Sequence, residues 1–225
     1  MSRTALRLAA ASLAGAAVLV TAGTGGMAAT AGTGSHAQGA DFTVHAEGAN
    51  LTAYAAGGAH LPFRDGPPAR VTGGFGEDSC FACHWDGTEN DEVGTLTIAG
   101  FPEHFQASVT YDLEITLTHP ELEVAGFQLA IRRAEDGVQA GHLEVAEGEE
   151  ERVRILTDRE IDFAHHLVPG IEPTGEQATR WRLRWVAPEA PEGNVLLHAS
   201  VVAGDGDHSQ MGDAVYTIEL ESRPR

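Results

Sequence analysis

The chain has 225 residues, and its 33 acidic residues outnumber its 14 basic ones, giving a formal net charge of −19. Every basic residue is arginine. This excess of negative charge repels nucleic acid and anionic membranes, so we exclude both as partners and expect a protein partner to present a basic face.

Residues 1–29 have the pattern of a secretory signal peptide. Arg3 and Arg7 form a short basic start, an Ala-rich apolar stretch runs from Leu8 to Ala22, and small residues surround Met27. The apolar stretch is short, which favours cleavage and leaves anchoring as the alternative. No second apolar span follows, so the mature chain is expected to be secreted or periplasmic without a membrane span. It would keep 12 arginines against 33 acids, a net charge of −21.

Two low-periodicity segments come next. Residues 30–60 are rich in Gly, Ala, Thr and Ser and are interpreted as a flexible lead-in, with one short strand at Phe42–His45. Residues 61–93 contain prolines and a Gly-Gly pair, and they predict a loop with one or two helical turns around Cys80–Trp85.

The run Ser-Cys-Phe-Ala-Cys-His-Trp in this loop is the attachment signature of c-type haem. Cys80 and Cys83, the only cysteines of the chain, would form thioethers with one haem, and His84 would be the proximal iron ligand. The alternatives are a chance motif with a local disulfide or weak metal site, and a redox-active Cys-x-x-Cys. No thioredoxin-like β-α-β pattern surrounds the motif to support the latter.

From Gly94 onward, apolar and polar residues alternate in short runs. This pattern predicts an antiparallel β-sandwich of seven to nine strands over residues 94–221. Trp181 and Trp185 are expected in its core, and Gln128 and Arg132 on its outer side. The clear strands are 111–117, 127–131, 181–185, 195–202 and 214–220; the weaker ones are 95–99, 143–146, 152–156 and 161–163.

A second axial ligand of the iron is sought among loop residues. His166, and after it His165, follow a weak strand and precede the Pro169-Gly170 turn, and imidazole suits iron. Met211 is the next candidate, because His/Met coordination is also common. A vacant or water-bound sixth position remains the alternative.

Two further groups of charged residues are ambiguous. The aspartates between Asp205 and Asp213 alternate as in calcium loops but lack the final Glu of an EF-hand, so turn formation is the favoured interpretation. Arg64 and Arg70 flank the motif and either pair with haem propionates or are ordinary surface arginines.

The stretch Thr72–His84, the later Trp185-Val186-Ala187-Pro188 and the segment from Gly204 to Tyr216 resemble the bacterial reelin-like (Reeler-type) choice-of-anchor V domain. The resemblance covers about residues 65–221. It implies an immunoglobulin-like, all-β sandwich preceded by a haem-attachment segment, with a His before the Trp-rich strand at His165 or His166. Many relatives continue into a surface-anchoring tail, and surface attachment of this kind is not expected from the sequence here.

We therefore expect an exported monohaem cytochrome-like protein that transfers single electrons to a redox partner. A haem-based sensing or small-ligand module is the first alternative, and a surface- or matrix-binding sandwich with structural or no haem is the second. No catalytic triad order, phosphate loop or paired-carboxylate spacing stands out, so enzymatic activity is not expected.

Overall fold

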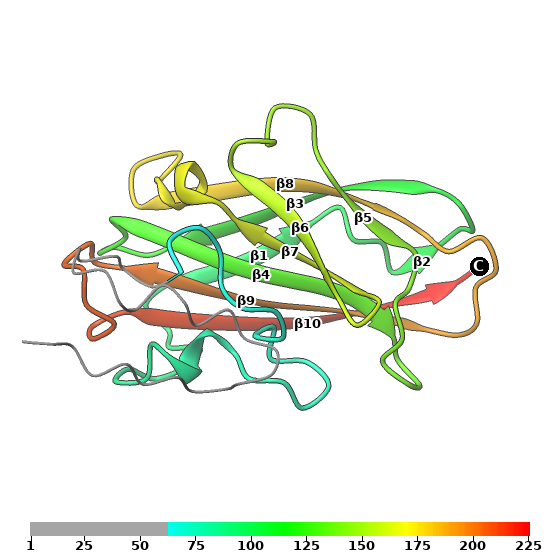
Figure 1. The fold of residues 1–225 in the computed structure, drawn as a ribbon, viewed down its shortest axis with the longest axis horizontal. Coiled ribbons are helices and arrows are strands. Elements are labelled where there is room, and N and C mark those ends of the chain that lie inside the picture. Colours follow the sequence, from blue (N-terminus) through cyan, green and yellow to red (C-terminus); the bar gives the residue numbers. More distant parts are fainter. Residues whose placement is uncertain (1–62) are drawn as a thin grey trace, which may run out of the picture. The chain divides into compact units, whose positions relative to one another are not determined.

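The computed structural model describes residues 63–225, which form two sheets of β-strands packed face to face (Figure 1). The predicted signal peptide 1–29, the lead-in 30–60 and the strand at Phe42–His45 lie outside the described residues. Within the described part, the only helices are two short 3₁₀ turns, η1 (Cys80–Ala82) and η2 (Val168–Ile171). None of the helices found between residues 63 and 225 has the length and apolar character needed to cross a membrane.

The two sheets differ in size, and all neighbouring strands are antiparallel except the short parallel pair β2–β10. The smaller sheet has the order β1 (Thr95–Ala99), β3 (Thr110–Thr118), β8 (Ala178–Val186), β5 (His142–Val145). The larger sheet has the order β2 (His104–Phe105), β10 (Ala214–Pro224), β9 (Val195–Gly204), β4 (Val124–Arg133), β7 (Ile161–His166), β6 (Val153–Asp158). The predicted β-sandwich is confirmed.

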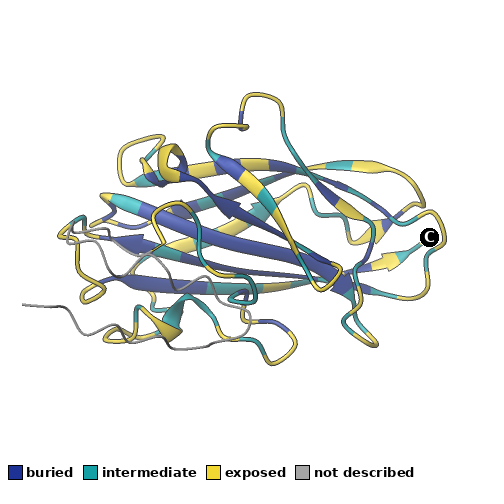
Figure 2. Cartoon of the chain, in the orientation of Figure 1, coloured by how far each residue is buried: buried dark blue, intermediate teal, exposed yellow. Residues whose placement is uncertain are grey.

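The core lies between the sheets, where the alternating apolar residues of each strand meet (Figure 2). Trp181 and Trp185 are fully buried, as predicted. The ring of Trp181 packs 4.7 Å from that of Phe127, which joins the two sheets, and its indole N–H donates to the Gly170 carbonyl at 2.7 Å. Both tryptophans satisfy their one polar group in this way, since Trp185 donates to the carbonyl of Ala140 at 2.8 Å.

The sequence pattern predicts that the outer face of β4 is exposed to solvent. In the structure this face is covered. Gln128 and Arg132 do point outward from the core, but they are buried, with 0% and 3% of their surface exposed. Residues 66–79, called here the strap, cover them. Gln128 accepts the Val71 N–H at 2.8 Å and donates to the Pro68 carbonyl at 2.9 Å, so its amide fastens the strap to β4.

A buried ion pair fastens the second half of the strap. Arg132 Nη2 contacts Glu77 Oε2 at 2.5 Å, and the guanidinium lies over the rings of Phe75 and Phe163. Glu77 also binds Arg70 at 3.0 Å. The strap therefore has a fixed path across β4, which brings the residues after it onto β9 and β10.

Candidate haem-attachment site

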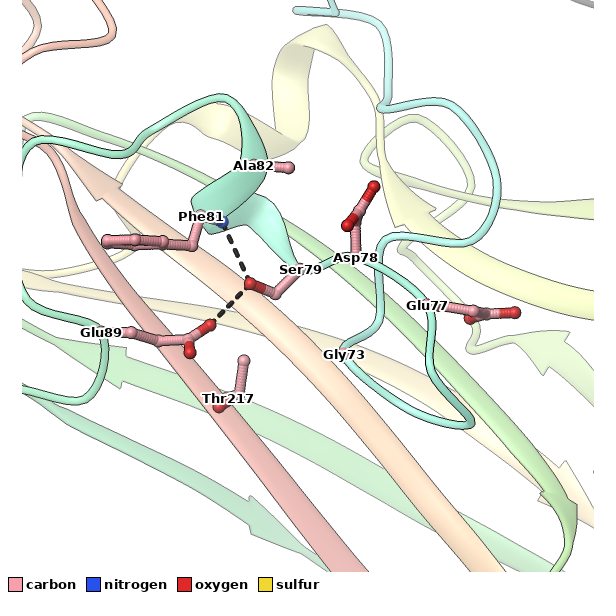
Figure 3. Close-up of a pocket in the computed structure, with 8 residues that line it drawn as sticks. All are labelled: Gly73, Glu77, Asp78, Ser79, Phe81, Ala82, Glu89 and Thr217. Carbon is pink, nitrogen blue, oxygen red and sulfur yellow. Dashed lines mark hydrogen bonds between the residues drawn. The ribbon is translucent and has the colours of Figure 1, made fainter. Parts of the chain in front are cut away.

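The Cys-x-x-Cys-His motif forms the short turn η1, which rests on β9. Ser79 caps the turn by accepting the Phe81 N–H at 3.2 Å, and its hydroxyl donates to Glu89 at 2.6 Å (Figure 3). The Cys80 N–H donates to the Ser200 hydroxyl of β9 at 2.9 Å. The turn is thus tied to the sheet at its first cysteine.

His84 lies one helical turn after Cys80, because its N–H donates to the Cys80 carbonyl at 3.0 Å. Its ring contacts Asp213, just before β10, with 2.5 Å between Nδ1 and Oδ2. An ionised carboxylate only accepts hydrogen bonds, so this contact places a proton on Nδ1, and in the neutral ring Nε2 then keeps its lone pair. The Asp213 side chain is buried, with 5% exposed, whereas His84 remains 26% exposed.

A second contact joins the same two loops. Asp86 accepts the Gly212 N–H at 2.9 and 3.0 Å through its two oxygens. The loop between β9 and β10 is therefore held beside the motif at two neighbouring residues, Gly212 and Asp213. Met211 belongs to this loop and is 46% exposed. Trp85, directly after His84, is 59% exposed.

The two thiols of the motif have different surroundings. Both are free in the structure, but Cys83 is exposed and Cys80 is partly covered. Burial of the Cys80 thiol raises its pKa to about 11, partly offset by a hydrogen bond with Ser200. The Cys80 thiol is therefore protonated at neutral pH.

An open cavity of about 340 Å³ adjoins the motif, but the thiols do not line it. Its wall includes the two middle residues of the motif, Phe81 and Ala82, together with Glu77, Asp78 and Glu89 (Figure 3). The carboxylates of Asp78 and Glu89 would repel the propionates of a haem. Neither cysteine nor His84 lines this cavity, so it is not taken as the haem site.

The two predicted distal histidines lie elsewhere on the sheet. They are not in a loop: β7 extends through His166, so the predicted loop placement is wrong. His165 on β7 is paired with Gln128 on β4, and Gln128 is in turn paired with Ser200 on β9. Since neighbouring strands are about 4.8 Å apart, β7 lies about 10 Å from β9 and about 14 Å from β10. Among the described residues, neither His165 nor His166 contacts His84.

Both β7 histidines also have their own partners. His166 accepts the Phe127 N–H on Nδ1 at 3.0 Å, and its Nε2 lies 3.3 Å from the Phe63 carbonyl. Desolvation lowers the pKa of His166 to about 4 and also lowers that of His165. His165 contacts the His166 carbonyl through Nδ1 at 2.8 Å, beneath Gly66 of the strap. Met211 is the predicted ligand that lies in the same loop as Asp213.

The remaining charged candidates, Arg64, Arg70 and the 205–213 loop, differ in their surroundings. Arg70 binds Glu77 and Asp158, while Arg64 is exposed. In the 205–213 loop, Asp205 accepts the Asp207 N–H at 3.0 Å, which is a turn-forming contact. Among residues 63–225 no group of three or more potential metal-ligating side chains is found.

The described residues fit a covalently held haem in three respects. Both thiols are free, His84 is held through Nδ1 while its Nε2 has no hydrogen-bond partner among the described residues, and apolar side chains beside it are exposed. Sequence reasoning missed the two residues that hold the motif, Asp213 and Ser200. Asp213 was interpreted as a turn residue, and its 129-residue separation from His84 leaves no local signal.

Comparisons with known proteins give structural matches but no match to a family model or a curated protein. The human F-spondin reeler domain is 19% identical, with 62% of this chain and 96% of that chain covered at a TM-score of 0.43. The reelin-N domain of F-spondin is 22% identical, covering 64% and 96% at 0.42. A cohesin module from a Clostridium perfringens family 33 glycoside hydrolase is 12% identical, covering 59% and 97% at 0.42. At these values no function is carried over, and the fold rests on the strands themselves.

Proposed function

We propose that this chain is an exported carrier of one covalent c-type haem and that it transfers single electrons outside the cytoplasm. Cys80 and Cys83 would hold the haem, and His84 would be its proximal ligand. When bound, the haem iron supplies the one-electron couple. The observation that carries the proposal is the ring of His84, held through Nδ1 by Asp213 so that Nε2 is left for iron.

The surroundings of the thiols argue against a redox-active dithiol. A reactive cysteine needs a lowered pKa and an electropositive environment. At Cys80, burial and the nearby Glu89 both raise the thiol pKa, to about 11. Since the thiolate is the reactive form, we expect haem attachment at Cys80 to be faster before η1 docks on β9.

The acidic surface supports a redox partner with a basic face. With 33 acidic against 14 basic residues in the whole chain, long-range attraction would speed the encounter with such a partner. Rates of electron exchange with a basic protein should then fall as ionic strength rises.

One observation favours a second candidate, a haem module that binds a small ligand. The histidines predicted to complete the coordination, His165 and His166, are buried on β7 and away from His84. Unless Met211 supplies the second axial ligand, the position opposite His84 stays accessible. Met211 therefore distinguishes electron transfer from ligand binding.

The test is to produce the full chain in an exporting host with the haem-attachment machinery and to record ferric and ferrous spectra with and without carbon monoxide. Electron transfer predicts low-spin spectra in both states, no carbon monoxide binding to the wild type, and high-spin spectra for Met211→Leu. His208→Gln, in the same loop, is the matched control and should behave as wild type. A high-spin ferrous wild type that binds carbon monoxide would overturn electron transfer in favour of ligand binding.

A further inference from the structure

We propose that Asp213 is the positioning residue of the haem iron ligand: its buried carboxylate fixes the ring of His84 and strengthens the ligand for ferric iron. This inference rests on the proposed function. Asp213 is not itself expected to contact the haem.

The geometry begins with the carboxylate. Asp213 is buried although it is charged, and its one side-chain hydrogen bond among the described residues is to Nδ1 of His84. It packs against Gly204 at the end of β9, where an added Cβ would lie 3.1 Å from its Oδ1. A side chain at Gly204 would therefore crowd both Val124 and the carboxylate.

The loop around Asp213 holds the carboxylate in a fixed position. Gly212 is bonded to Asp86 on the motif side, and Ala214 begins the pairing of β10 with Ala203 of β9. Asp213 is thus fixed between a sheet strand and a cross-loop hydrogen bond. A ligand held from a rigid strand keeps its orientation better than one held by the mobile end of a loop.

The chemical consequence follows from charge. A carboxylate that accepts the Nδ1–H of a metal-bound imidazole fixes the tautomer and raises the basicity of Nε2. A more basic ligand favours the more highly charged metal, so the ferric state gains more than the ferrous state. The reduction potential should therefore be lower with Asp213 than with a neutral hydrogen-bond acceptor at the same place.

The experiment compares Asp213→Asn with Asp205→Asn in the haem-loaded protein. Asp213→Asn keeps an oxygen that can accept the Nδ1–H but removes the charge. Asp205→Asn makes the same change at an exposed aspartate of the same loop. We expect Asp213→Asn to lower the ferric-over-ferrous preference about tenfold, which raises the potential by about 59 mV for one electron, while Asp205→Asn leaves it unchanged.

A second readout uses the haem-free protein, so it does not depend on haem attachment. Nitrogen NMR of the histidine rings should show the Nδ1–H tautomer at His84 in the wild type and a tautomer mixture in Asp213→Ala. Covalent haem with an equal potential in Asp213→Asn and wild type would overturn the inference and leave the proposed function standing. A wild type without haem would overturn the proposed function, while the tautomer measurement would still decide whether Asp213 orients His84.

Discussion

His84 and His166 lie on the same sandwich, and in both the protein holds Nδ1. At His84 the partner is the Asp213 carboxylate, which accepts a proton from Nδ1 and leaves the lone pair of Nε2 available. At His166 the partner is the Phe127 N–H, which donates to Nδ1 and places the proton on Nε2, facing the Phe63 carbonyl. The first arrangement prepares a metal ligand, and the second uses the ring as a structural bridge. The role of each histidine is thus set by the group that contacts its Nδ1, and not by the residue type alone.

The largest expected effect is a loss of unfolding free energy when His166 is substituted. His166→Ala leaves a cavity and an unpaired Phe127 N–H in the core, so it should lower the free energy of unfolding of the haem-free protein by about 3–5 kcal/mol. Urea unfolding measures this loss. His208→Ala, at an exposed loop position, is the control, and a comparably small loss for His166→Ala would mean that His166 is not a structural bridge.

The pH dependence of stability sharpens the same contrast. Desolvation lowers the pKa of His166 to about 4 in the folded chain, below its ordinary value near 6.5. The unfolded chain therefore binds the proton first as pH falls, and stability decreases from about pH 6.5 down to pH 4, by about 3 kcal/mol for this group. Urea unfolding across this range should show a shallower decrease for His166→Gln than for wild type. Parallel curves would contradict the assigned role of burial.

A third prediction compares the two thiols beside His84. Because burial raises the pKa of Cys80 to about 11 from an ordinary value near 9, its thiolate population at pH 8 is about 100-fold lower than that of an ordinary thiol. Alkylation followed by peptide mass analysis should modify Cys83 first and Cys80 about 100-fold more slowly in the folded haem-free chain. In urea the two rates should converge. Equal rates without urea would show that η1 does not stay docked on β9.

The smallest effect concerns Trp85. Since its side chain is largely exposed, Trp85→Ala should change the unfolding free energy of the haem-free protein by no more than about 0.5 kcal/mol. The same substitution should destabilise the haem-loaded protein more, if Trp85 covers the haem. Val109→Ala is the surface control for both forms. Equal effects with and without haem would remove Trp85 from the site.

The sequence predicts those strands whose burial is one-sided. The alternation in β3 and β8 is visible because one face meets the core and the other meets water. The same logic fails for Gln128 and Arg132, since a strap from more than 50 residues away buries them. It also fails for the end of β7, where two histidines are polar in type yet buried by the same strap and core. Burial by a distant segment leaves no local pattern.

The candidate site also has a part that the sequence predicts and a part that it does not. The spacing of Cys80, Cys83 and His84 is a local signal, so the motif could be found without a structure. The groups that position it, Asp213 and Ser200, approach only when β9 and β10 pair and the strap crosses the sheet. Contacts of such sequence separation depend on the whole fold, and a single sequence does not reveal them.

The most direct test of the account is the intact mass of the exported chain under denaturing conditions, after production with the haem-attachment machinery. We predict that the wild type retains the mass of one haem and a haem-staining band, and that the Cys80→Ser/Cys83→Ser variant retains neither while remaining folded. An exported, folded wild type that carries no haem would contradict the account.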